Sequence, residues 1–193
     1  MASEMSKVPG MAKLRILYND ESTTQQGIPA YNTEFLVVPD DGVDDTTFNA
    51  SVAEKILEVK VPGAPLNGLT TVQIADYYGE PKNVKFTRPT KVMVQFFAKI
   101  ATNPTTGVID TSQVPVETQA IIDYVQSVDV GEGISWSRIL GMLAGDSGFV
   151  ITDWGLRKVG SSTWLKTDIT PNSVREYLWI DTDNIDISTT AGQ

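Results

Sequence analysis

The chain has no histidine and no cysteine among its 193 residues. Without histidine, histidine-based nucleophilic triads are excluded, and the most common general base and zinc ligand are both missing. Without cysteine there are no disulfides, thiolate metal sites or cysteine nucleophiles. Other bases remain, so these absences narrow the range of possible enzymes without excluding every hydrolase.

The chain also lacks a dense basic cluster and a long apolar run. Its 15 lysine and arginine residues stand against 24 aspartate and glutamate residues, a net charge of −9. Because nucleic-acid binding depends mainly on neutralised phosphates, we expect no nucleic-acid partner. No apolar run approaches the roughly 20 residues of a membrane helix, and no signal peptide is visible, so we expect no membrane partner. The acid excess fits either plain solubility or docking to a basic partner surface.

Hydrophobic periodicity predicts an α+β fold with two small mixed modules in tandem. The expected divisions are an N-terminal strand and linker at 1–27, a first module at 28–89, a second at 90–188 and a frayed tail at 189–193. The first module should contain a strand, a helix and a hairpin. The second should contain a strand, two helices and several strands.

In the first half of the chain, alternating apolar residues indicate strands and one switch to a helical period. The predicted elements are strands at 13–18 and 33–38, a helix at 46–59, and a hairpin of strands 69–74 and 82–86. Asp45 or Thr46 is expected to cap the helix, since their oxygens can accept from its free amides. Pro62-Gly63 should end it.

The second half opens with a strand at 92–100 whose nearly continuous apolar middle indicates burial on both faces. A long polar loop at 102–114 follows, and Pro115 suits the first turn of a helix. Ser135 is expected to cap a second helix that ends at Gly145. The remaining predictions are paired strands at 149–159 and 164–169, a third at 178–180 and a short edge at 185–187.

Acidic clusters are the strongest remaining candidates for chemistry. Asp40-Asp41 and Asp44-Asp45 crowd the loop before the first helix, where aspartate favours turns and caps. The stretch 181–186 lacks the glycine and final glutamate of a calcium loop and is predicted to be an exposed turn. We therefore expect no catalytic residue, no metal and no cofactor. The four tryptophans can serve either packing or aromatic platforms for sugars.

Two stretches of the chain carry a family resemblance. The first runs from Gly27 through the strand at 33–38 to Phe86-Thr87-Arg88-Pro89, and the second runs from 124 through Gly131-Glu132 to 138. In this order and separation they resemble the carboxyl-terminal half of baseplate J-like proteins, the wedge subunits of contractile phage tails. The chain departs from that pattern at 39–42, where the family often shows paired glycines, and in lacking the family's amino-terminal half.

The residues that carry the resemblance form a structural signature rather than an active site. They are Gly68, Phe86, Arg88, Pro89, Gly131, Glu132 and Arg138. Arg88 is expected either to pair with an acid and fix the angle between modules, or to be a solvated arginine before a proline.

The resemblance implies a non-enzymatic structural component of a baseplate wedge, in the virion tail and made in the cytoplasm of a bacterial host. Its implied partners are other wedge subunits and copies of itself in a ring, with tail hub or sheath proteins as further candidates. The alternative, motivated by the tryptophans, the 102–114 loop and the carboxylates, is a tail domain that binds or hydrolyses cell-surface glycans.

Overall fold

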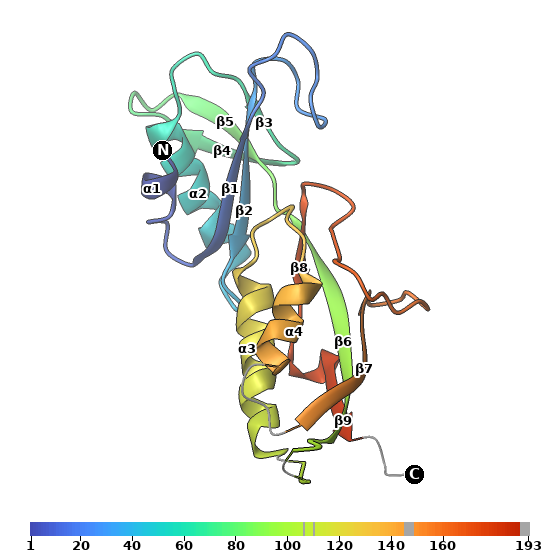
Figure 1. The fold of residues 1–193 in the computed structure, drawn as a ribbon. Coiled ribbons are helices and arrows are strands. Elements are labelled where there is room, and N and C mark those ends of the chain that lie inside the picture. Colours follow the sequence, from blue (N-terminus) through green and yellow to red (C-terminus); the bar gives the residue numbers. More distant parts are fainter. Residues whose placement is uncertain (106, 110, 145–148, 190–193) are drawn as a thin grey trace. The chain divides into compact units, whose positions relative to one another are not determined.

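The computed structural model describes residues 1–105, 107–109, 111–144 and 149–189. The chain forms two compact units, Met1–Thr90 and the part from Lys91 onward. Both mix helices with small sheets, so the α+β class is confirmed (Figure 1). The division falls one residue after the boundary expected at 89/90. The segment 1–27 belongs to the first unit, because its strand pairs within the sheet of that unit.

The first unit contains a three-stranded sheet in the order β1-β2-β3 and a separate hairpin, β4-β5. Strand β2 pairs antiparallel with β1 and parallel with the short β3. The strands are β1 (Met11–Tyr18), β2 (Thr33–Pro39), β3 (Leu66–Asn67), β4 (Thr70–Ala75) and β5 (Pro81–Phe86). The helices are α1 (Ala2–Met5) and α2 (Asp45–Val59). The predicted hairpin is therefore present, with Thr70 opposite Phe86.

Helix α2 buries the stripe that its sequence predicts. Phe48, Val52 and Ile56 are almost fully buried, and they pack in one cluster with Phe35 of β2 and Phe86 of β5. The expected cap at Asp45 or Thr46 is wrong by one residue. Asp44 is the N-cap, in extended conformation, and its carboxylate accepts from the Thr47 N–H at 2.8 Å. This hydrogen bond lowers the pKa of the Asp44 carboxyl.

The second unit is built on the long strand β6. Strand β7 pairs antiparallel with β6, β9 pairs parallel with it, and β8 is a further neighbour. The strands are β6 (Thr90–Thr102), β7 (Phe149–Lys158), β8 (Glu176–Trp179) and β9 (Ile185–Thr189). The helices are α3 (Val114–Ser127) and α4 (Trp136–Ala144), with short 3-10 turns η1 (Thr111–Gln113) and η2 (Thr182–Asn184).

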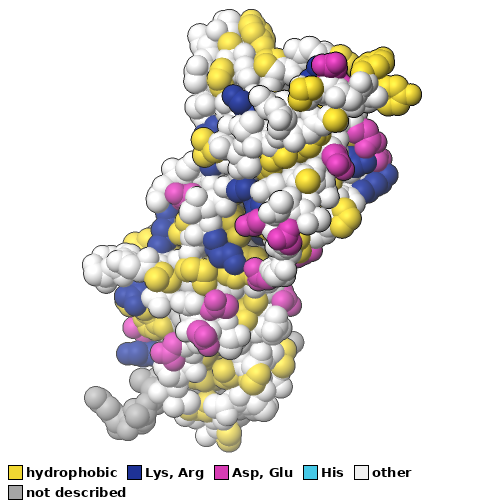
Figure 2. Space-filling view, turned by 180° about the vertical axis from the view of Figure 1, so that it is seen from behind, with side chains coloured by type: hydrophobic (Ala, Val, Ile, Leu, Met, Phe, Trp, Pro, Cys, Tyr) yellow, Lys and Arg dark blue, Asp and Glu magenta, His cyan; other side chains and the backbone are white. Residues whose placement is uncertain are grey.

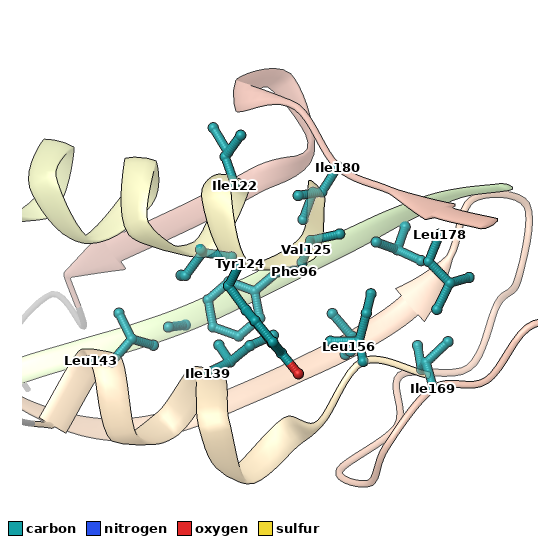
Figure 3. Packing of buried hydrophobic residues seen from close by; sticks show 14 residues of the cluster. Phe96, Ile122, Tyr124, Val125, Ile139, Leu143, Leu156, Ile169, Leu178 and Ile180 are labelled. Atoms are coloured by element: carbon teal, nitrogen blue, oxygen red, sulfur yellow. The ribbon is translucent and has the colours of Figure 1, made fainter. Parts of the chain in front are cut away.

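The core of the second unit joins β6 to the two long helices. Figure 3 shows Phe96 of β6 among Tyr124 and Val125 of α3, Ile139 of α4 and Leu156 of β7. The expectation that β6 is buried on both faces is wrong. Its burial alternates, with every second residue from 94 to 100 buried, while Phe97 is half-buried and Lys99 exposed. The opposite face keeps apolar character because Phe97 packs edge-on against Trp164.

The strand expected at 164–169 is not formed. Leu165 makes an isolated bridge with Leu156 of β7, whereas Ile169 bridges Ile134, just before α4. Because the two residues pair with different elements, no continuous ladder can run between them. The expected edge at 185–187 is confirmed as β9, which includes Thr189 from the predicted tail. Residues 190–193 of that tail and the helix end expected at Gly145 lie outside the described residues.

Candidate interaction surface

Gly68 and Phe86, two residues of the predicted signature, meet at the start of the hairpin. A Cβ atom on Gly68 would lie 2.4 Å from the backbone C, N and O atoms of Phe86. Real side chains do not tolerate such distances, so only glycine lets the segment after β3 cross the end of β5. The Phe86 ring is fully buried in the core beneath. The pair therefore fixes where the hairpin attaches to the unit.

Arg88 binds helix α2 of its own unit. Its Nη1 donates to Asn49 Oδ1 at 2.8 Å and its Nη2 to Asp45 Oδ1 at 2.9 Å. The guanidinium carbon lies 5.2 Å from the centroid of the Phe48 ring, within cation–π range. Arg88 thus pairs with an acid, as one alternative predicted. Both partners belong to the first unit, however, so these contacts fix the segment before the half-buried Pro89 to α2.

A buried hydrogen-bond network that the sequence did not reveal lies beside this segment. Glu34 of β2 is fully buried, and its carboxylate accepts from Thr87 Oγ1 at 2.5 Å and from Asn67 Nδ2 at 2.8 Å. The Thr87 hydroxyl also accepts from the Leu69 N–H at 3.2 Å. The Thr87 backbone N–H donates to the Phe35 carbonyl, which extends the sheet at β2. The network ties β2, β3 and the end of β5 together.

The remaining signature residues lie in the second unit, Gly131 and Glu132 between α3 and α4 and Arg138 in the first turn of α4. Gly131 has a φ of 77°, a backbone that favours glycine, and its N–H donates to the Glu176 carbonyl at 2.7 Å. The Glu132 side chain is exposed, and its N–H closes a turn onto Asp129. The guanidinium of Arg138 lies 4.6 Å from the centroid of the Tyr124 ring. Gly131 and Glu132 thus form a turn that joins α3 to α4.

Asp168 supports the start of α4. Its carboxylate accepts from the Trp136 N–H at 2.8 Å, and so satisfies an amide that the helix itself leaves unpaired. The expected cap residue, Ser135, exchanges a hydrogen bond with the Ser137 hydroxyl at 3.0 Å. Its own N–H donates to the Tyr124 hydroxyl oxygen at 2.8 Å.

All four tryptophans make contacts inside the second unit. Trp136 and Trp154 stack with an angle of 3° between their planes, and Lys166 lies over Trp154. The others each have a cation over the ring, Arg157 at 4.1 Å from the Trp164 centroid and Lys91 at 4.5 Å from the Trp179 centroid. At least one face of every tryptophan ring is therefore used within the chain. This weakens the motivation for a sugar platform.

The tip of the β4-β5 hairpin presents the most exposed aromatic residues of the first unit. Tyr77 is 95% exposed and Tyr78 83%. Asp76 holds the turn: its carboxylate accepts from the N–H groups of Tyr78 and Glu80, and its side chain lies 3.4 Å from Lys82 Nζ. Partial burial opposes ionisation of Asp76, but these hydrogen bonds and the lysine outweigh it and lower the pKa of the carboxyl.

Neither a metal site nor a membrane-spanning helix is found in the described part of the chain. Among those residues, no three acidic side chains come close enough together to hold a metal ion. Within the same residues, no helix combines the length and apolar character needed to cross a membrane.

Comparison with known proteins gives a similarity of fold. No protein-family model matches the sequence, and no curated protein matches it. A solved structure does match with a TM-score of 0.54 and 14% sequence identity over 93% of this chain, and it is the cryo-EM structure of the anti-feeding prophage (AFP) baseplate, 6-fold symmetrised. The chain has the fold of part of a baseplate protein. It spans 36% of the length of that protein.

Glu34 and the Asp76 turn were missed by sequence reasoning for different reasons. A glutamate inside the apolar run 33–38 is a signal in itself, because a charge in a buried strand requires partners. The tyrosine pair lies in a segment that was correctly predicted as a hairpin loop. Nothing in the local sequence separates two exposed tyrosines from two that fold back onto the core.

Proposed function

We propose that this chain is a structural component of the baseplate of a contractile injection machine and acts through protein–protein assembly. The fold similarity to a baseplate protein over 93% of the chain carries the proposal. The sequence resemblance to baseplate J-like proteins supports the same role. It rests on residues in both units.

The finer assignment that we propose is a wedge subunit, located in the baseplate of a phage or phage-like particle. Its partners would be other wedge proteins and copies of itself around a ring, with hub or sheath proteins as further neighbours. The arrangement of the signature residues fits such a part. Gly68 and Arg88 fix local geometry in the first unit and the Gly131 junction fixes it in the second, so both units offer rigid surfaces.

The proposal includes no catalytic step. A part that must hold its neighbours in register needs large, pre-ordered surfaces, and interfaces in permanent complexes commonly bury about 2,000 Å² or more in total. The exposed tyrosines on a hydrogen-bonded turn are one such pre-ordered element.

The test is to label the chain inside particles. The chain carries a small epitope tag in the cells that encode it, and intact injection particles are purified. We expect the tag in the particle fraction, and antibody label at the baseplate end of the tail in electron micrographs. Complete particles that lack the chain would overturn the proposal.

A further inference from the structure

Strand β5 of the first unit has an unpaired edge. Strand β4 pairs with it on one side, and no other strand of the described chain pairs with residues 81–85. In an antiparallel pair, successive residues direct their backbone groups alternately toward the partner strand and away from it. The Asp76 N–H donates to the Glu80 carbonyl, so by this alternation Asn83 and Lys85 point away from β4. Within the described residues, the backbone groups of Asn83 and Lys85 have no hydrogen bond outside the β4-β5 pair.

Two residues further along, the same edge already pairs with a strand. The Thr87 N–H donates to the Phe35 carbonyl at 2.8 Å, and the Val37 N–H donates to the Thr87 carbonyl at 3.0 Å. A strand added at Asn83 and Lys85 would therefore extend a line of hydrogen bonds that the fold itself begins. Addition of an extended segment to a free sheet edge is a common mode of protein recognition.

A groove lies beside this edge and leaves room for such a segment. Its volume is about 380 Å³. The lining consists of residues 82–85 of β5, residues 64–66 at the start of β3, and the end of α2 at Leu57 and Lys60. Leu57 and Leu66 give the lining an apolar part, so a bound segment can bury apolar atoms while its backbone pairs with β5.

The groove carries a surplus of positive charge, although the chain as a whole has a net charge of −9. Its lining contains three lysines, Lys60, Lys82 and Lys85, and one carboxylate, Asp76. Asp76 lies 3.4 Å from Lys82 Nζ and offsets that charge, whereas no described carboxylate forms an ion pair with Lys60 or Lys85. Acidic and basic side chains are interspersed on the face of the molecule that Figure 2 shows, so a surplus of one sign is a local feature.

This charge argues against a second copy of the same edge as the occupant. Lysines on a sheet edge disfavour pairing between identical edges, because like charges would be brought together. Pro81, at the start of β5, also limits such pairing, since proline has no N–H to donate. A segment with aspartate or glutamate side chains meets no such repulsion, because its charge is complementary to the lysines.

We infer that the β5 edge binds an extended, acidic segment of a neighbouring protein in the assembly. The backbone of that segment pairs with Asn83 and Lys85, and its aspartate or glutamate side chains lie against Lys60 and Lys85. The inference rests on the proposed function, because the neighbour is another part of the same particle.

Competition during assembly tests the role of charge. Cells that encode the particle make the wild-type chain and a tagged variant in equal amounts, and mass spectrometry measures the ratio of the two in purified particles. We expect Lys85→Glu to be under-represented about tenfold, because a carboxylate then faces the acidic segment. The matched control is Lys99→Glu, at an exposed strand lysine of β6 outside the groove, which should assemble like the wild type.

The same competition tests the role of the backbone. Asn83→Pro removes the N–H that points into the groove and leaves the hydrogen bonds to β4 in place, and we expect it to be under-represented about fivefold. The matched control is Gln73→Pro. Gln73 lies opposite Asn83, and its N–H points away from β5 at the other edge of the same hairpin. This control should assemble like the wild type, and circular dichroism should show wild-type folding for all four variants.

Photo-crosslinking inside particles identifies the occupant. Asn83, whose side chain is exposed, is replaced by a photo-reactive phenylalanine analogue, and the crosslinked peptide is sequenced after irradiation. We expect a segment of a different protein with aspartate or glutamate within about two residues of the crosslink, the reach of diagonal neighbours across a strand pair.

The outcomes separate this inference from the proposed function. If the tagged wild-type chain is absent from particles, the proposed function fails and this inference with it. If that chain is present but Lys85→Glu and Asn83→Pro compete equally with it, the inference alone is overturned. The absence of a crosslink at position 83, a crosslink to a second copy of the chain, or a crosslink to a segment without acidic side chains overturns it as well.

Discussion

Both units of this chain pack helices on small sheets around an apolar core, and the first unit adds a buried carboxylate that hydrogen-bonds between its strands. In the first unit, the buried Glu34 carboxylate joins two strands and the residue after a third through side-chain hydrogen bonds. In the second unit, the apolar cluster around Phe96 forms the centre of the core, and cation–π contacts lie around Trp164 and Trp179 nearer the surface. A buried charged group specifies one arrangement of its hydrogen-bond partners. Apolar contacts stabilise in proportion to the surface area that they bury, and they tolerate more than one arrangement of side chains.

The units also differ in a way that allows each to be followed separately. All four tryptophans, at 136, 154, 164 and 179, belong to the second unit. Tryptophan fluorescence therefore reports on the second unit alone, while far-UV circular dichroism reports on both. The predictions below run from the largest expected effect to the smallest, and those at Phe96 and Gly68 use these probes.

The dependence of the second unit on apolar packing is tested at Phe96. Phe96→Ala removes a ring that is 1% exposed at the centre of the cluster. We expect the free energy of unfolding of this unit to fall by about 3–5 kcal/mol, from lost transfer energy and the remaining cavity. The matched control is Phe97→Ala, on the half-buried face of the same strand, which should cost clearly less. Equal costs, measured by tryptophan fluorescence in urea, would contradict one-sided burial of β6.

The close backbone approach in the first unit is tested at Gly68. Gly68→Ala places a methyl group against the Phe86 backbone, and we expect it to cost about 3 kcal/mol as the hairpin is displaced. Gly141→Ala in α4 is the control: its Cβ meets nothing within 4 Å, so helix propensity predicts no loss and up to about 1 kcal/mol of gain. The dichroism transition should move for Gly68→Ala. A coincident fluorescence shift would show that both units unfold together, and wild-type stability would contradict the prediction.

The hydrogen-bond network is tested by a double-mutant cycle. Glu34→Gln keeps the shape of the side chain but removes an acceptor, and Thr87→Val removes the hydroxyl that donates to it. We expect each single change to lower the stability of the first unit by about 1–3 kcal/mol, since a buried group loses its partner. The double variant should cost less than the sum of the two. Strictly additive costs would show that the two side chains do not depend on each other.

The smallest expected effect concerns the pH dependence of the hairpin tip. The pKa of Asp76 is lowered below its ordinary value of 3.8, so the folded turn favours the charged form. Its contribution to stability is complete above the unfolded pKa and is lost as the pH falls through the folded pKa. Amide NMR signals of Tyr78 and Glu80 should therefore keep their folded positions at pH 5 and move only below about pH 4. Asp76→Asn should remove this titration, and a tip that titrates unchanged in that variant would contradict the assignment.

Local periodicity explains why much of the fold was predictable. The stripe of Phe48, Val52 and Ile56 specifies α2 without reference to the rest of the chain, and turn residues delimit the β4-β5 hairpin. Prediction failed where the outcome depends on the three-dimensional path of the backbone. Asp44 and Asp45 are chemically identical, and only the backbone angle at the helix entry selects Asp44 as the cap.

The residues of the candidate surfaces were predicted less well because their partners lie far along the chain. Arg88 reaches Asp45 across 43 positions, and Thr87 reaches Glu34 across 53. Contacts between residues so far apart leave no periodic pattern in the sequence. The sequence was therefore equally compatible with a role of Arg88 between the modules and with the contact to α2 that the structure shows. The wedge assignment stays a prediction, while the baseplate-like fold has support from both sequence resemblance and structure.

The order in which β6 acquires its neighbours has a consequence for synthesis. This strand comes first in its unit, yet β8 and β9 leave the ribosome more than 70 residues later. Until they arrive, one side of a long strand carries backbone groups with no partner from its own sheet, a template to which other nascent chains can add. Premature termination before Glu176 would make that vulnerability permanent, so truncated products of this gene should aggregate rather than accumulate as soluble half-folded protein.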